Sequence, residues 1–119
     1  MPTSQDRPSP SQRITEEVIS WRGVTAGFGK FGEFAFRVDG REIGHLHGDR
    51  EAHFVFDRQT RAELKEAGRV SDHPYFPANP KLAARRMRND EDVEDVIALM
   101  RLNYRAAMDR KTSTSEIAG

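Results

Sequence analysis

The segment from residue 34 to residue 47 constrains the fold of this chain more than any other. Apolar and polar side chains alternate before and after Asp39-Gly40, a favoured pair for a two-residue type I′ turn because both positions need a positive φ. The pattern predicts a β-hairpin with strands 34–38 and 41–47, and the two-residue loop fixes its register. The pairs expected to face each other are Val38 with Arg41, Arg37 with Glu42, Phe36 with Ile43 and Phe34 with His45.

The return strand of this hairpin carries two histidines, in the string Gly44-His45-Leu46-His47-Gly48. Side chains two residues apart on a strand point to the same side, about 7 Å apart along it. The predicted register places both imidazoles on the apolar face of the sheet, and the flanking glycines leave room for a ligand. Such a pair suits two ligands of one zinc, iron or nickel ion, or a base and a hydrogen-bond donor acting on one substrate. The alternative is that both imidazoles are hydrogen-bonded sheet residues, although burying two polar groups without a role is costly.

Three further residues could complete a metal site around this pair, although their spacing does not demand it. They are Asp49, His53 and His73. Taken singly, His53 and His73 are expected to be structural or exposed. His73 precedes Pro74 in a proline-rich segment that could swing over the face of the sheet. The sequence therefore predicts no cofactor, and a metal ion only if His45 and His47 bind it.

The rest of the chain alternates between helical and strand-like segments. The expected helices are residues 11–22, 57–67 and 90–108, and the expected further strands are 53–56, 82–87 and a short one within 24–32. These segments predict an α+β fold with a mostly antiparallel sheet, helices packed on one face, and the order α-β-β-β-α-β-α. Residues 27–32 fit the pattern G-x-G-x-x-G, but they follow a helix and precede a strand, so the segment is expected to be a flexible loop rather than a dinucleotide site.

Length and charge limit the classes of protein to which the chain can belong. It has 119 residues, with 19 basic and 19 acidic side chains and no cysteine. A chain of this length forms one domain, and the lack of cysteine excludes disulfides, thiolate metal sites and thiol catalysis. No apolar run could span a membrane and no signal-peptide core follows Met1, so we expect a cytoplasmic protein with no membrane partner. Residues 1–12 and 110–119 are expected to be disordered tails around a domain at 13–109.

A basic segment, residues 81–88, precedes the last predicted helix and carries Lys81, Arg85, Arg86 and Arg88. Neighbours on a strand face opposite sides, so only one of Arg85 and Arg86 can share a face with the histidines. Either arginine could bind an anionic group of a ligand, and Asp49 is a further candidate for substrate binding. The alternatives are a nucleic-acid or protein-binding module that uses residues 81–88, or a solvated strand edge.

Three strings in the sequence resemble the small bacterial domains called luciferase-like, which share a domain family with the fungal luciferase. The strings are Ile14-Thr15-Glu16-Glu17-Val18 with Trp21-Arg22-Gly23-Val24, then Arg41-Glu42-Ile43-Gly44-His45-Leu46-His47-Gly48-Asp49, and Glu91-Asp92-Val93 with Leu102-Asn103-Tyr104. The resemblance covers about residues 13–108. Such domains often have Trp-Val-Ser-Arg-Arg where this chain has Leu82-Ala83-Ala84-Arg85-Arg86. A weaker similarity links the order of elements to YjbR-like domains.

The resemblance implies an oxygenase-like ancestry without a bound cofactor, and most members of the family have no known function. Combined with the histidine pair, it leads us to expect that the chain binds a small aromatic or anionic molecule as a monomer or homodimer. If the chain is an enzyme, His45 and His47 are the candidate catalytic residues, one as general base and the other holding a substrate oxygen. Arg85 or Arg86 would pair with an anionic group of the substrate.

Overall fold

The computed structural model describes residues 7–118, which form one six-stranded sheet and three helices. In chain order the elements are α1 (Pro10–Ile19), β1 (Val24–Phe28), β2 (Phe34–Val38), β3 (Arg41–His47), β4 (Glu51–Val55), α2 (Arg58–Glu66), β5 (Ser71–Asp72), β6 (Leu82–Arg86) and α3 (Asp90–Ala118). The strands lie in the order β1-β2-β3-β4-β6-β5, and every neighbouring pair is antiparallel. The predicted α+β class is confirmed, and helices and strands alternate in the predicted order, with four strands instead of three before α2 and two instead of one after it.

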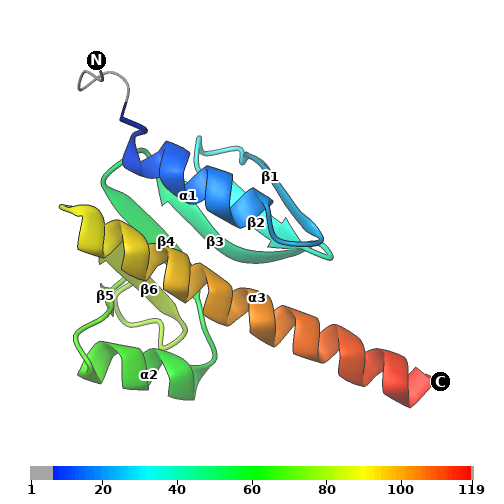
Figure 1. Cartoon of the computed structure of the whole chain (residues 1–119). Helices are drawn as coiled ribbons and strands as arrows, with labels where there is room; N and C mark the ends of the chain where they lie inside the picture. The colour runs from blue at the N-terminus through cyan, green and yellow to red at the C-terminus, as the bar shows by residue number, and fades with distance from the viewer. Residues whose placement is uncertain (1–6, 119) are drawn as a thin grey trace.

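Two helices cover one face of this sheet. In Figure 1, α1 and α3 lie side by side across the front of the strands, and α2 lies below them beside β6. The core between helices and sheet is apolar, and its fully buried side chains include Ile14, Val18, Phe36, Leu46, Phe54, Val96, Leu99 and Met100. The opposite face of the sheet carries no helix among the described residues. No helix in residues 7–118 is long and apolar enough to cross a membrane.

The ends of the first and last helices differ from the predicted ones. α1 begins at Pro10 because Ser9 caps it, with its side chain accepting from Gln12 N and the Gln12 side chain accepting from Ser9 N. α3 is capped by Asn89, whose Oδ1 accepts from Asp92 N at 2.8 Å. It continues to Ala118, beyond the predicted end at residue 108, because neither proline nor glycine interrupts residues 90–118. Both helices therefore extend into the segments expected to be tails.

The hairpin turn forms where the sequence predicts it, but the register changes partway along the strands. Asp39 and Gly40 have φ values of 51° and 75°, and the two pairs next to the turn are the predicted ones. A β-bulge follows, so that Phe36 faces Gly44 and Ala35 faces His45. The predicted pairs of Phe36 with Ile43 and of Phe34 with His45 are wrong, because β3 contains one additional residue at the bulge.

The bulge lets β3 bury two apolar side chains that a regular strand would separate. Ile43 and Leu46 are three residues apart, so a regular strand would point them to opposite faces. Both are 1% exposed and belong to the core. The carbonyl of Ile43 accepts from Asn103 Nδ2 of α3 at 3.2 Å, so the backbone of the bulge is satisfied from the helix side.

The same shift turns His45 and His47 away from the helices. Gly44 and Leu46 face the core, and the two histidines between and after them face the side without helices. The predicted placement of both histidines on the apolar, core-facing side is therefore wrong. The physical reason is that burying Ile43 and Leu46 together stabilises the bulged register, whereas the regular register would bury two imidazoles.

We predict that Gly44→Ala destabilises the fold by about 1–3 kcal/mol, because a core this full resists added atoms. A Cβ at Gly44 would lie 2.6 Å from Met100 Sδ and 3.1 Å from Phe54 Cδ1. Urea unfolding measures the loss. Gly27→Ala, on the edge strand β1 of the same sheet, is the matched control, because a Cβ there meets nothing within 4 Å. Equal stability of the two variants would contradict the packing of α3 onto Gly44.

Candidate metal centre

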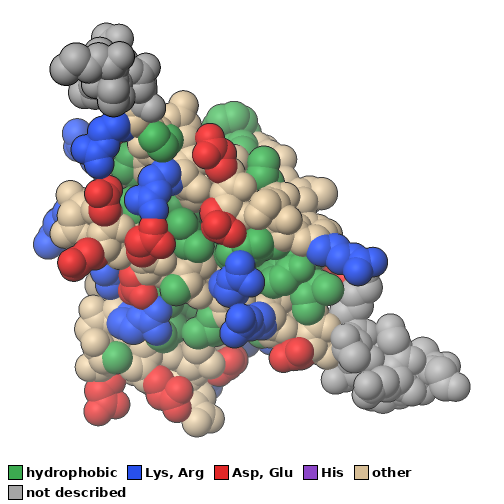
Figure 2. Space-filling model, viewed as in Figure 1, with side chains coloured by type: hydrophobic (Ala, Val, Ile, Leu, Met, Phe, Trp, Pro, Cys, Tyr) green, Lys and Arg blue, Asp and Glu red, His purple; other side chains and the backbone are tan. Residues whose placement is uncertain are grey.

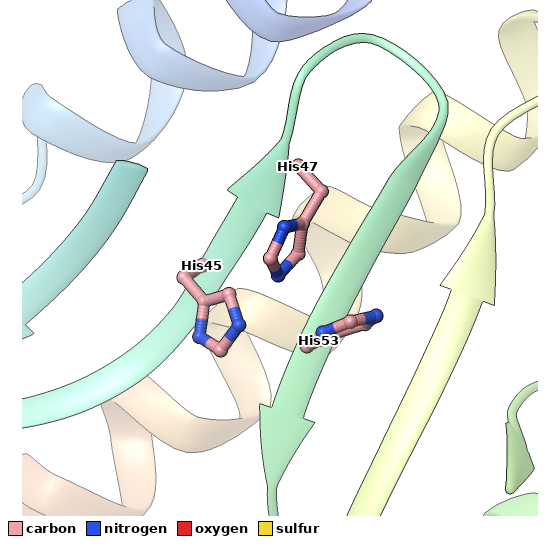
Figure 3. A group of neighbouring side chains, drawn as sticks. All are labelled: His45, His47 and His53. Atoms are coloured by element: carbon pink, nitrogen blue, oxygen red, sulfur yellow. The ribbon is translucent and has the colours of Figure 1, made fainter. Parts of the chain in front are cut away.

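Three histidines gather on the helix-free face of the sheet. His45 and His47 extend from β3, and His53 from β4, where it is the direct cross-strand partner of His45. One ring nitrogen from each lies within 4.8 Å of the other two. Figure 3 shows the three rings converging on the same side of the two strands. Figure 2, which views the helix-covered face, shows no histidine there.

His53 is buried without any partner for its polar atoms. The residue is 3% exposed, and neither ring nitrogen has a hydrogen-bond partner among the side chains and backbone that the structure describes. The nearest carboxylate oxygen, Glu51 Oε1, is 3.6 Å from Nε2, which is too long for a hydrogen bond. A buried polar group left in this state costs about 1–3 kcal/mol, so a fold that retains it calls for a reason. A cation bound by one of the nitrogens would supply the missing partner.

His45 has the hydrogen bond that is typical of a metal-binding imidazole. Its Nδ1 donates to Glu42 Oε2 at 2.8 Å, which fixes the ring orientation and leaves the lone pair on Nε2. Glu42 lies three residues earlier in the chain and reaches the same face because the bulge falls between the two residues. The Glu42 carboxylate therefore orients the His45 ring without itself belonging to the three-histidine cluster.

The fourth histidine of the chain lies against the other three. His73 comes from the loop after β5, is 8% exposed, and places its ring centroid 4.4 Å from that of His53. Its Nδ1 accepts from Tyr75 N at 3.1 Å and from Phe76 N at 3.3 Å. All four histidines of the sequence are thus in one cluster, and the proline-rich segment reaches the histidine-bearing face through His73, whose ring contacts that of His53.

The cluster disfavours protonation of its buried members. Burial, and after it the neighbouring His47, His73 and His45 in that order, together lower the pKa of His53 to about 3. Burial is also the main cause that lowers the pKa of His73. At neutral pH His53 is therefore uncharged, with a lone pair that a metal ion can use.

The two arginines predicted as site residues point to opposite faces of the sheet. Arg86 is exposed on the histidine-bearing face, opposite Glu51 of β4. Arg85 faces α3, where it binds Asp92 at 2.6 Å and Asp95 at 3.2 Å. The charge of Arg85 is therefore compensated by carboxylates of α3, on the face opposite the histidines. The basic segment 81–88 thus presents fewer unpaired charges than its composition suggests.

Asp49 lies in the turn between β3 and β4 and is joined to α1. Its Oδ1 accepts from Ser11 N at 2.9 Å, and the hydrogen bonds from Ser11 hold the pKa of this carboxyl below its usual value. The ligand atoms that gather into the cluster belong to His45, His47 and His53. Sequence reasoning named His53 only as one of three optional ligands and did not single out Glu42. The signal for the position of His53 was the alternation of side-chain directions along the strand. Because Phe54 is buried against the helices, its neighbour His53 points to the other face.

We predict that metal-free protein loses stability in acid through His53. Because the pKa of His53 is lower in the folded chain than the usual 6.5, the unfolded chain takes up a proton that the folded chain refuses. The free energy of unfolding should therefore fall as pH drops from 6.5 toward 3, by on the order of 2 kcal/mol at pH 5. Urea unfolding with a chelator present measures the slope. His53→Leu should flatten this slope, because the ring that refuses the proton is gone, while the lowered pKa of His73 leaves a smaller slope; parallel slopes would contradict the burial of a neutral His53.

Comparison with known proteins identifies the family. The family model described as Luciferase domain matches residues 40–103, more than half of the chain. The match includes all four histidines, Glu42, and Asn103 at the bulge. No curated protein and no solved structure matches the chain, and nothing in these comparisons supports the YjbR-like resemblance. The chain belongs to the Luciferase domain family.

Proposed function

We propose that this domain binds a divalent first-row transition metal ion through His45, His47 and His53 and presents it to a small molecule on the helix-free face. The observation that carries the proposal is His53, whose two buried ring nitrogens lack partners beside two other imidazoles within 4.8 Å. A structural histidine would be hydrogen-bonded at that depth. A ligand of a metal ion keeps a nitrogen free for it.

The donor set indicates the class of ion. Imidazole nitrogens suit zinc, iron, nickel and copper, whereas calcium and magnesium prefer oxygen ligands. Three protein ligands with one position left open are typical of catalytic rather than structural zinc sites. Glu42 accepts a hydrogen bond from His45 Nδ1 and so orients this ligand, as carboxylates do in many metal sites. When bound, such an ion supplies Lewis-acid or redox chemistry to the molecule beside it.

The charge balance of the site favours an anionic molecule. Three neutral imidazoles leave the double charge of the ion uncompensated, so a negative group is attracted to the open position. Arg86, exposed on the same face, pairs with an anionic end that extends toward β6. Tyr75 and Phe76, 76% and 61% exposed beside His73, offer rings on which an aromatic molecule can stack. The proposed molecule is therefore a small aromatic or aliphatic anion. The family resemblance implies oxygenase-like chemistry on it, and the histidines would support acid–base chemistry.

The first test of this function is metal binding. Wild-type protein stripped by a chelator should take up one Co²⁺ or Zn²⁺ per chain, measured by titration calorimetry and by elemental analysis after desalting. His53→Leu should lose at least about tenfold in affinity, because one of three ligands is gone. The same variant should unfold at equal or higher urea concentration without metal, because the unpartnered buried nitrogens are gone.

Asp49→Asn is the matched control, because this carboxylate contacts α1 instead of the cluster, and it should bind metal like wild type. Wild-type protein that takes up no metal, or a His53→Leu variant that binds as tightly as wild type, would refute the proposed centre. Loss of metal binding in a folded His53→Leu chain supports it, since misfolding cannot be the cause.

The carboxylate behind His45 provides a separate prediction. Glu42→Gln should weaken metal binding by about 10–100-fold, because the neutral amide no longer holds the Nδ1 proton as a carboxylate does. Glu51→Gln is the matched control, because it removes the same charge from the same face, but Glu51 has no hydrogen bond to a ring nitrogen. Competition with a chromogenic chelator measures both affinities. If the two variants lose the same amount, general electrostatics and not the hydrogen bond explains the effect.

A further inference from the structure

We propose that His73 is a ligand-binding residue of this site: its Nε2–H donates a hydrogen bond to a small anion held at the open position of the metal ion. The inference rests on the proposed metal centre and goes beyond it, because it assigns a different role to the one histidine that is outside the three-ligand set. It also defines the ligand class, which is an anion with an acceptor atom small enough to lie between the ion and a ring.

The hydrogen bonds of His73 assign the position of its proton. Its Nδ1 accepts from Tyr75 N at 3.1 Å and from Phe76 N at 3.3 Å. A nitrogen that accepts from two N–H groups carries no hydrogen, so the proton of the neutral ring is on Nε2. That atom is a donor and has no lone pair to offer to a cation. His73 therefore complements the three neighbouring imidazoles, which have lone pairs available, instead of duplicating them.

Residues before and after His73 in the sequence fix the position of its ring. After it, the backbone of residues 75 and 76 holds Nδ1. Before it, Asp72 is bound by Arg61 at 2.6 Å and by Lys65 at 2.7 Å. Arg61 is itself buried and donates through Nε to Leu82 O at 3.0 Å, which connects α2, β5 and β6. A donor fixed in this way loses little freedom when it binds an anion.

The position of His73 beside the cluster makes it available to a bound anion. Its ring lies 4.4 Å from that of His53, and it interacts electrostatically with His45, His47 and Glu51. Figure 3 shows the rings of His45, His47 and His53 on one side of β3 and β4. The loop after β5 brings the ring of His73 against that of His53. An anion on the ion would have the ion on one side and the Nε2–H donor on another, and two such contacts select for an acceptor with negative charge.

Two substitutions separate the donor from the loop contact. In His73→Asn, the side-chain oxygen can replace Nδ1 as acceptor for the backbone of residues 75 and 76, but no group reaches the position of Nε2. In His73→Gln, the longer side chain can bring an amide N–H to that position. Both variants leave His45, His47 and His53 in place, so both should bind Co²⁺ within about threefold of wild type.

The experiment titrates azide into the Co²⁺-loaded full chain and follows the visible absorption bands of the metal. We expect His73→Asn to weaken azide binding by about tenfold or more, the usual loss for a hydrogen bond to a charged group, and His73→Gln to recover part of it. Equal azide affinity in wild type and His73→Asn would overturn the role of His73 while leaving the metal centre intact. Loss of Co²⁺ in both variants would also overturn it, by making His73 a fourth ligand. Wild-type protein that takes up no Co²⁺ would refute the metal centre and this role together.

Discussion

The β-bulge at Ile43 and Gly44 is the constraint on which the rest of the structure depends. It allows β3 to bury Ile43 and Leu46 together, and it turns His45 and His47 to the face without helices. The helix α3 holds the bulge in place, with Met100 packed where Gly44 lacks a side chain and Asn103 bonded to the carbonyl of Ile43. Core packing on one side of the strand therefore sets the chemistry displayed on the other side.

The histidine face costs the fold some of its stability. His53 retains two buried nitrogens without partners, and three imidazoles around it disfavour any positive charge. A leucine or a phenylalanine at this position would avoid both costs. Strained or unsatisfied groups that persist in a stable fold tend to lie at functional sites, where a ligand completes them. The ligand that we propose for the three imidazoles of this domain is a transition-metal ion.

Local patterns in the sequence predicted most of the fold because they depend on local physics. The turn at Asp39-Gly40, the cap at Asn89 and the helix stripe of α3 all involve residues close in the chain. The bulge was missed because a turn fixes register only while both strands stay regular. Its signal was the odd spacing of Ile43 and Leu46, but only the contact with α3, sixty residues away at Asn103, decides which register wins. The pairing of His53 with His45, and the loop that adds His73, likewise depend on long-range packing.

The central claim is that one ion lies between His45, His47 and His53, and locating it in a crystal tests this most directly. Crystals grown with Zn²⁺ and measured at the zinc absorption edge should show one anomalous peak on the helix-free face. It should be bonded to one nitrogen of each ring at about 2.0–2.1 Å, with Glu42 still bonded to Nδ1 of His45. A map without a peak at this cluster, with His53 hydrogen-bonded to water or to Glu51 instead, would contradict the account.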